Sequence, residues 1–162
     1  MDCQFDWTSE EIVEVSIEDL EKQFEEFREK RGIQGRRYDI GCPTPWIPLV
    51  LELEAKISDL APEYSILQVK EKFGGLRFYS ASGQEDKEVN EKIYALIGQA
   101  EAKSYKICQF CGKDALPEEE NTFTSWYYTC CPDCLAYLNE HKRYAGIDDG
   151  RTTVACRIGR NV

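Results

Sequence analysis

The stretch QVKEKFGGLRFYS, residues 68–80, decides the fold, because two strand-forming runs meet there at a pair of glycines. Glycine readily adopts positive φ angles, so Gly74 and Gly75 can form the two-residue turn of a β-hairpin. The residues on either side are rich in β-branched and aromatic types, as strands are. The sequence therefore predicts antiparallel strands at 65–72 and 76–81.

This turn fixes the pairing of the two strands. Lys72 then faces Arg77, and Phe73 faces Leu76. Like charges that face each other across a ladder repel, so we expect a negative group above Lys72 and Arg77. The alternatives for that group are the protein's own acidic helix, a phosphorylated or carboxylated ligand, and a partner protein. A three-residue loop would pair Glu71 with Arg77 instead and would remove this argument.

Side chains alternate between the two faces of such a hairpin. The face predicted to pack on the helices holds Leu67, Val69, Phe73, Leu76 and Phe78. The other face is predicted to be cationic and holds Gln68, Lys70, Lys72, Arg77 and Tyr79. Arginine and lysine bind anions and a tyrosine ring can stack on a base, so this face fits a nucleotide-like ligand. Arg36 and Arg37, from the Gly- and Pro-rich connector 31–45, are also predicted to contribute to this ligand-binding face.

The N-terminal region is strongly acidic. Residues 1–30 hold 11 Asp/Glu and 3 Lys/Arg, in a chain whose formal net charge is -10. Ser16 is predicted to cap a helix there, and its apolar positions are Ile17, Leu20, Phe24 and Phe27. The charged side of this helix is either an ordinary solvated face or an acidic surface that docks on a partner or mimics a nucleic acid.

Two further helices complete the predicted core. Thr44 and Pro45 resemble the N-cap and first residue of a helix that ends at 61–62, and a third helix is predicted over 86–106. The apolar residues of the third helix are Val89, Ile93, Leu96, Ile97 and Ala100. The sequence therefore predicts an α+β fold in which helices pack on a β-hairpin.

The strongest chemical signal is a pair of cysteine motifs, CQFCG at 108–112 and CCPDC at 130–134. Two Cys-x2-Cys pairs separated by 19 residues match the spacing of a structural zinc site. The predicted ligands are Cys108, Cys111, Cys131 and Cys134. Residues 123–131 resemble a strand and 132–144 a helix, which predicts a treble-clef-like or ribbon-like zinc finger. Cys130 is the alternative to Cys131.

Four thiolates saturate a zinc ion and leave no position for water, so this zinc is predicted to hold the fold rather than to catalyse. The sequence contains no nucleophile elbow, phosphate loop or HExxH motif. His141, the only histidine, is predicted to be a surface or packing residue. A carboxylate-dependent hydrolase is the enzymatic alternative, and no catalytic residue is assigned.

Length and composition narrow the class of protein. A chain of 162 residues forms one domain or one domain with a small appendage, here a helical and hairpin region at 1–106 and a zinc-finger region at 107–162 packed on it. Eight cysteines without a secretory signal in MDCQFDWTSEE indicate metal binding in the cytoplasm rather than disulfides. The acidic balance excludes a general nucleic-acid binder, and no apolar run is long enough to span a membrane.

Three segments, PWIPLVLELEAKI, APEYSILQVKEKFGGLRFY and AEAKSYKICQFCG, resemble a family of small, largely uncharacterised proteins encoded by tailed bacteriophages, prophages and bacteria. The similarity covers about residues 41–134. It implies a signature, present here, of Lys70, Glu71, Lys72, Gly74, Gly75, Arg77 and Tyr79. Because small phage proteins often act on host machinery or host defence, the resemblance implies a role in the host cytoplasm.

The sequence supports two main functional hypotheses. In the first, the protein binds an anionic small molecule or an acidic partner through Lys70, Lys72, Gly74, Gly75, Arg77, Tyr79, Arg36 and Arg37. In the second, the acidic N-terminal helix inhibits a host protein by docking on its basic surface or by mimicking a nucleic acid. One structural zinc ion is the predicted cofactor in both.

Overall fold

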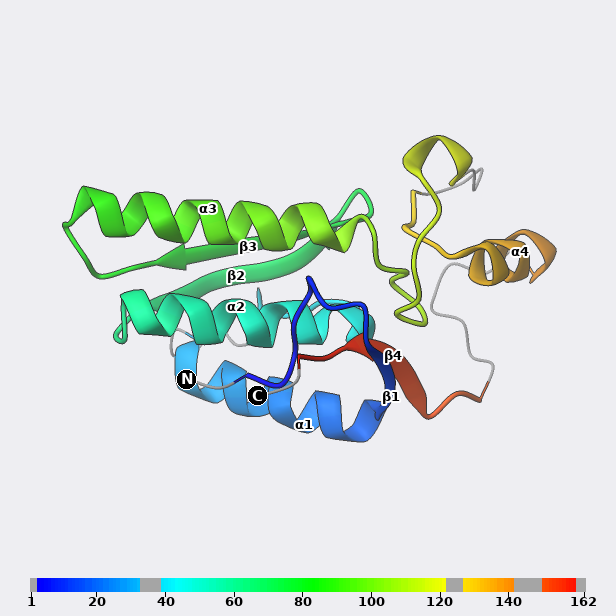
Figure 1. Cartoon of the computed structure of the whole chain (residues 1–162), viewed down its shortest axis with the longest axis horizontal. Coiled ribbons are helices and arrows are strands. Elements are labelled where there is room, and N and C mark those ends of the chain that lie inside the picture. Colours follow the sequence, from blue (N-terminus) through cyan, green and yellow to red (C-terminus); the bar gives the residue numbers. More distant parts are fainter. Residues whose placement is uncertain (1–2, 33–38, 122–126, 142–149, 160–162) are drawn as a thin grey trace.

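The computed structural model of the chain describes residues 3–32, 39–121, 127–141 and 150–159 (Figure 1). Its helices are α1 (Ile17–Arg31), α2 (Ile47–Leu60), α3 (Lys87–Ser104) and α4 (Pro132–His141). Its strands are β1 (Ile12–Ser16), β2 (Ser65–Lys72), β3 (Gly75–Ala81) and β4 (Thr153–Arg157), paired as β1–β4 and β2–β3. The predicted α+β class is confirmed. Arg36 and Arg37 lie outside the described residues.

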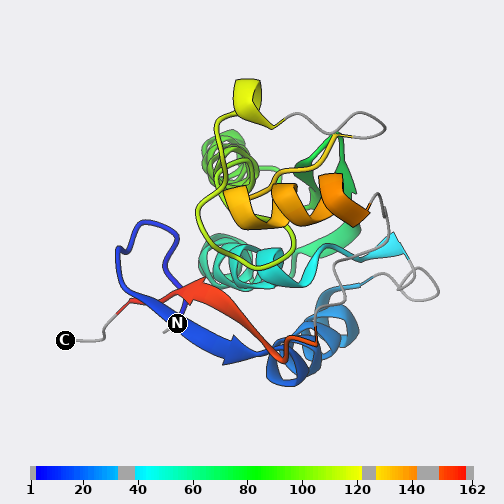
Figure 2. The same ribbon diagram turned by 90° about the vertical axis from the view of Figure 1, so that its right-hand side faces the viewer.

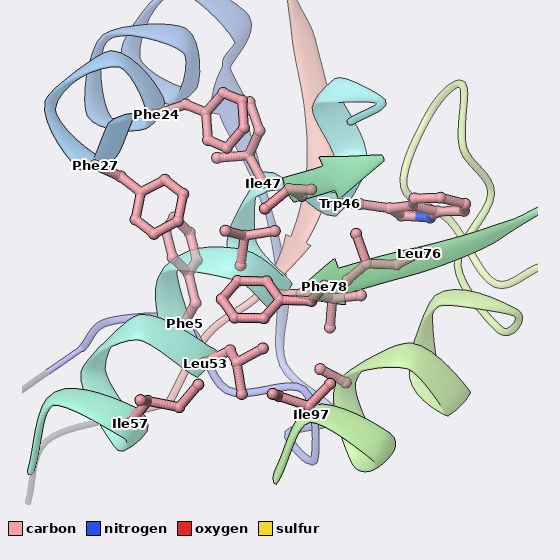
Figure 3. Close-up of a cluster of buried hydrophobic side chains, with 14 of the residues drawn as sticks. Phe5, Phe24, Phe27, Trp46, Ile47, Leu53, Ile57, Leu76, Phe78 and Ile97 are labelled. Atoms are coloured by element: carbon pink, nitrogen blue, oxygen red, sulfur yellow. The ribbon is translucent and has the colours of Figure 1, made fainter. Parts of the chain in front are cut away.

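The core forms where the hairpin meets the helices. Figure 1 shows α3, β3, β2, α2 and α1 following one another across the molecule, and Figure 3 shows their apolar side chains converging. Trp46, Leu53 and Leu76 are fully buried there. The indole N–H of Trp46 donates to the carbonyl of Ile107 at 3.0 Å, which ties this core to the residue before the first cysteine pair.

Helix α1 begins where the sequence predicts. The Ser16 side chain accepts a hydrogen bond from the Asp19 N–H at 3.4 Å and so satisfies one of the free donors of the first turn. Of the predicted inward residues, Leu20, Phe24 and Phe27 are buried, and Ile17 is partly buried against the core. The helix therefore uses its apolar stripe for the core and leaves most of its charged residues on the surface.

Helix α2 begins later than predicted. A 3-10 turn at Thr44–Trp46 precedes it, and the α-helix starts at Ile47, so the assignment of Thr44 as its N-cap is wrong. The Thr44 hydroxyl instead donates to the Glu21 carboxylate at 2.7 Å. This bond links the start of α2 to α1, and Pro48 fits the first helical turn because no N–H is needed there.

The hairpin forms, but its turn lies one residue earlier than predicted. Phe73 and Gly74 adopt positive φ angles of 52° and 79°, as a turn with two left-handed residues requires. Gly75 is instead the first residue of β3, where a Cβ atom would lie 2.3 Å from the side chain of Tyr105. Close packing, rather than the turn, therefore explains the second glycine.

The shifted turn changes the pairing of charges. Lys70 faces Arg77, and Glu71 faces Leu76. The predicted pair of Lys72 with Arg77 is therefore wrong, and so is the alternative pair of Glu71 with Arg77. Two like charges still face each other across the ladder, because Lys70 takes the place that the prediction gave to Lys72.

The predicted inward face is correct for three residues and wrong for two. The three that are buried are Val69, Leu76 and Phe78. Leu67 is 36% exposed, because a register irregularity between Ile66 and Gln68 turns Ile66 inward in its place. Phe73 is 63% exposed because it lies in the turn itself.

Both outer edges of the hairpin are covered by other parts of the chain. On β3, two N–H groups donate to side chains of α3, and the closer bond joins Leu76 to the Ser104 hydroxyl at 2.9 Å. On β2, the carbonyl of Val69 accepts from the Gly41 N–H at 2.9 Å. The hairpin therefore presents little free backbone to another protein.

A second strand pair, which the sequence does not predict, joins β1 to β4. Val15 faces Val154 in this antiparallel ladder. The outer edge of β4 is covered, because the Ala155 N–H donates to the carbonyl of Cys111 at 2.9 Å. Gly112 has a φ angle of 85°, and a Cβ atom there would lie 2.1 Å from the Ala155 carbonyl oxygen. The loop that carries the first cysteines thus packs directly on the β1–β4 sheet.

The strand predicted at 123–131 is wrong over its described part. Residues 127–131 form no strand. The carbonyls of Thr129 and Cys130 accept single hydrogen bonds from Gln109 and Leu116, at 2.9 and 2.8 Å. These two bonds reach separate points of the connection between α3 and Glu118, so no continuous ladder forms, and the segment serves to bring the second cysteine pair up to the first.

Candidate metal centre

The first cysteine pair lies in a tight loop after α3. The Cys108 N–H donates to the carbonyl of Lys113 at 2.8 Å, and the Gly112 N–H donates to the carbonyl of Cys108 at 3.0 Å. The left-handed backbone of Gly112 allows the chain to reverse directly after Cys111. The loop is therefore closed by its own backbone hydrogen bonds.

The second cysteine pair is placed by the start of α4. Pro132 is the first helical residue, and the N–H of Cys134 donates to the sulfur of Cys131 at 3.4 Å. The four buried residues Cys108, Cys111, Cys131 and Cys134 have sulfur atoms within 4.8 Å of one another. The structure thus brings together the four predicted ligands, and four sulfurs at this spacing can hold a metal ion tetrahedrally.

The acid–base chemistry of the cluster also favours a cation. Hydrogen bonds with Cys108 lower the pKa of Cys131 to about 7 and bring the pKa of Cys111 well below its usual value. Hydrogen bonds among the same sulfurs raise the pKa of Cys108 and Cys134. Thiolates this close repel one another, so the four can ionise together only when a cation compensates them.

Cys130 differs from its neighbour Cys131 in both position and chemistry. It is fully buried but does not belong to the cluster of four. Burial raises the pKa of its thiol to about 12, so it stays protonated. Its N–H donates to the side-chain carbonyl of Asn121 at 3.2 Å, which fixes the backbone before the metal-binding pair. The geometry therefore supports Cys131 as the ligand.

The three remaining cysteines and the histidine do not belong to the cluster. Cys3, Cys42 and Cys156 form no disulfide, and Cys156 is buried. His141 is exposed at the last described turn of α4, where its ring stacks on that of Tyr137 with centroids 4.0 Å apart. This arrangement gives His141 a packing role on the helix surface.

Sequence reasoning missed Arg151, which contacts the cluster from outside. One guanidinium nitrogen donates to the carbonyl of Phe110 at 3.0 Å, and another lies 3.9 Å from the sulfur of Cys134. A cavity of 330 Å³ beside the sulfurs is lined in part by Arg151 and Lys113. A cation at this distance stabilises thiolate charge. No ligand spacing marks an arginine 17 residues from Cys134, so the sequence carried no signal for it.

The hairpin turn docks against the region that carries the cysteines. The Thr129 hydroxyl donates to the Gly74 carbonyl at 2.5 Å, and a Cβ atom at Gly74 would lie 2.4 Å from the Tyr127 ring. Tyr105 covers Gly75 in the same way. Gly74 and Gly75, which the sequence assigns to ligand binding, are therefore both buried and allow the turn to approach these side chains closely.

The outward face of the hairpin, here called the cationic face, consists of Lys70, Lys72, Arg77 and Tyr79. Lys72 and Tyr79 are exposed, whereas Lys70 and Arg77 are half-buried. The Arg77 guanidinium donates a hydrogen bond to the Tyr105 hydroxyl at 3.2 Å, and this bond is the main reason why the pKa of Arg77 is raised. Two cavities of the protein, with volumes of 330 and 480 Å³, are lined by residues other than these four.

The acidic helix does not supply the counter-charge for this face. Figure 1 shows α2 between α1 and the hairpin. Two basic residues of α1 pair within α1 or with α2, namely Arg28 with Glu25 at 3.2 Å and Lys30 with Glu54 at 3.5 Å. Across the described ranges, no salt bridge involves a cation of the cationic face.

Two carboxylates on α2 have structural partners, of which Glu52 is buried and Glu54 is half-buried. Glu54 accepts from the guanidinium of Arg31 at 3.0 and 3.1 Å and from the Tyr64 hydroxyl. Glu52 accepts from the Trp7 N–H at 2.8 Å, and burial raises the pKa of its carboxyl. They hold the N-terminal segment and α1 against α2, so this geometry lends no support to the hydrolase alternative.

Comparisons of this chain with protein-family models, curated proteins and solved structures found no match. The resemblance to phage-encoded proteins therefore stays a prediction. Within the described ranges, none of the helices combines the length and the apolarity that a membrane span requires.

Proposed function

We propose that this chain is a small binding protein, held together by one structural zinc ion, whose cationic face binds an anionic, nucleotide-like ligand. The observation that carries the proposal is the cross-strand pair of Lys70 and Arg77, which no described carboxylate bridges. Two like charges in this position repel. A phosphate group would remove the repulsion and form charge-assisted hydrogen bonds with both.

The surroundings of the pair support a ligand with a flat ring beside its phosphate. Tyr79 is 44% exposed on the same face and offers a surface for stacking a base. Arg77 is already positioned, because its guanidinium donates to the carbonyl of Leu76 at 3.1 Å and to the hydroxyl of Tyr105 at 3.2 Å. Such positioning reduces the ordering cost of binding.

Zinc is the proposed metal because four thiolates in a tetrahedral arrangement favour it over harder cations. All four coordination positions come from the protein, so the ion serves the fold. It also supports the cationic face, since Thr129, close in sequence to the second cysteine pair, hydrogen-bonds the hairpin turn at Gly74. The resemblance to phage-encoded proteins supports a host signalling nucleotide as the ligand and the host cytoplasm as the place of action.

Replacing Arg77 with alanine is expected to abolish the response to such a ligand. We expect one member of a panel of nucleotides, cyclic dinucleotides and nucleotide sugars to raise the melting temperature of the wild-type protein. A ligand at 100 times its Kd stabilises the native state by about 2.7 kcal/mol. Truncation of a buried charged partner costs roughly 2–5 kcal/mol of binding, so even a partly exposed arginine should reduce affinity by about tenfold or more. Differential scanning fluorimetry measures both effects.

The matched control is Lys87→Ala, which removes the same charge from a side chain that is 90% exposed on α3. It should keep the ligand response of the wild-type protein. The proposal is wrong if no member of the panel stabilises the wild type and Arg77→Ala alone lowers the melting temperature. That result would assign the cationic face to fold stability.

A further inference from the structure

The outer edge of β1 carries backbone groups that bond to no described residue. The Ile17 N–H donates to the carbonyl of Thr152 at 2.9 Å, next to the ladder between β1 and β4. In an antiparallel pair alternate residues bond to the partner strand, and those between them direct their N–H and C=O groups away. Ile12, Glu14 and Ser16 are the residues of β1 whose backbone groups point away from β4. Ser16 is the N-cap of α1, and no described group bonds to the backbones of Ile12 and Glu14.

This open edge contrasts with the other strand edges in the described ranges. Segment 40–41 and α3 cover the edges of the hairpin, and the loop of Cys111 covers the edge of β4. Figure 2 shows β4 between β1 and α2, with β1 as the outer strand. A free strand edge is a template for another strand, and proteins usually block such edges. The edge of β1 is therefore suited to accept an extended segment.

The charges around the edge define what segment would fit. Residues 9–19 contain five acidic residues and no lysine or arginine. Four of the five are exposed, namely Glu10, Glu14, Glu18 and Asp19. Ile12 is also 44% exposed and offers one apolar contact. Opposite charges on neighbouring strands attract, so the complementary strand carries lysine or arginine side chains with an apolar residue between them.

A second copy of the chain fits the edge poorly. Antiparallel pairing of β1 with itself would set an acidic strand against an acidic strand, with Glu14 near its own counterpart. Like charges across a ladder are destabilising. The same acidic character that disfavours self-association favours a basic partner, and it steers such a partner toward the edge.

We propose that the outer edge of β1 docks an extended, lysine- or arginine-rich segment of another protein, which adds to the β1–β4 sheet as a third strand. Backbone hydrogen bonds at Ile12 and Glu14 provide affinity, and the surrounding carboxylates select the basic side chains. This surface is separate from the cationic face and carries the opposite charge. The protein therefore has a second binding function that does not depend on the nucleotide-like ligand.

The probe is a capped heptapeptide of alternating lysine and valine, added to the full-length protein. We expect the amide hydrogen exchange of Ile12 and Glu14, measured by NMR, to slow by tenfold or more at saturating peptide. The same peptide with glutamate in place of lysine should have no effect. A lysine–valine peptide N-methylated at every residue, which keeps its charge but lacks backbone donors, should also leave the exchange rates unchanged.

The substitution Ile12→Pro tests the same edge by changing the protein instead of the peptide. Proline is tolerated at the first residue of a strand when its N–H is not used in the ladder, and Ile12 meets both conditions. This variant should lose peptide binding, whereas Ile12→Thr, which keeps the N–H, should retain it. The proposal would be overturned if the N-methylated peptide protected the Ile12 and Glu14 amides as well as the unmethylated peptide does. It would also be overturned if millimolar lysine–valine peptide gave these amides no protection. Protection that rises with protein concentration alone would assign the edge to a second copy and overturn it as well.

Discussion

Cys131→Ala is expected to abolish metal binding, whereas Cys130→Ala should keep one metal ion per chain. The two residues are adjacent and both buried, but only Cys131 belongs to the cluster of four sulfurs. Structural zinc contributes roughly 10–16 kcal/mol of apparent binding free energy at pH 7 in zinc-finger peptides. That is comparable to the whole stability of a domain, roughly 5–15 kcal/mol. Elemental analysis of purified protein gives the metal content, and thermal denaturation gives the stability.

Removal of the metal from the wild-type protein provides the matching experiment. A strong chelator should lower the melting temperature of the wild type and of Cys130→Ala to the value of Cys131→Ala. The four thiolates would then have to take up protons or separate, because their charges are no longer compensated. Wild-type protein that contains no metal, or that keeps its melting temperature in chelator, would contradict the assignment of a structural metal site.

Among the described glycines, Gly112→Ala is expected to be the most destabilising substitution by alanine. The residue has a φ angle of 85°, which costs an alanine roughly 1–2 kcal/mol. The added carbon would also lie 2.1 Å from the carbonyl oxygen of Ala155. That oxygen belongs to β4, whose backbone is held by the ladder to β1 and by the bond from Ala155 to Cys111. Overpacking of this kind adds roughly 1–3 kcal/mol, and together these terms lower the melting temperature by on the order of 10 °C.

Gly98→Ala is the matched control, because nothing lies within 4 Å of a Cβ atom built there. Gly98 is inside α3, where alanine is a better helix former by roughly 0.5–1 kcal/mol. The same substitution should therefore raise the free energy of unfolding at one glycine and lower it at the other. Equal effects in urea denaturation would show that the loop at Gly112 does not pack on β4 as described.

The features that could be predicted depend on residues close together in sequence. The Cys-x2-Cys spacings, the cap at Ser16 and the apolar stripe of α1 are local patterns, and the structure places all of them as expected. The hairpin was predicted for the same reason. Its register was not, because the second glycine serves a contact with Tyr105, which lies 30 residues further along the chain and leaves no mark on the hairpin sequence.

The features that could not be predicted depend on distant contacts. β1 has only five residues, and its partner lies near the other end of the described chain, so neither strand has a local signal strong enough to identify it. Arg151 approaches the sulfurs only because β4 returns past the cluster. The cationic face was predicted from strand parity, but the position of α2 between α1 and the hairpin, which keeps the acidic helix away from this face, depends on packing between distant elements.

The pairing of β1 with β4 has a consequence for the order in which the protein folds. Arg157 of β4 donates to the carbonyl of Ser9 across 148 positions of sequence, so almost the whole chain forms the loop that this sheet closes. The hairpin and α3 close far shorter loops, and short loops form sooner. During synthesis, residues 12–16 must therefore wait for residues 153–157 to leave the ribosome, with both edges unpaired. Pulsed hydrogen exchange during refolding should accordingly show protection of Val13 and Val15 after that of Lys70, whose N–H faces β3 in the hairpin ladder.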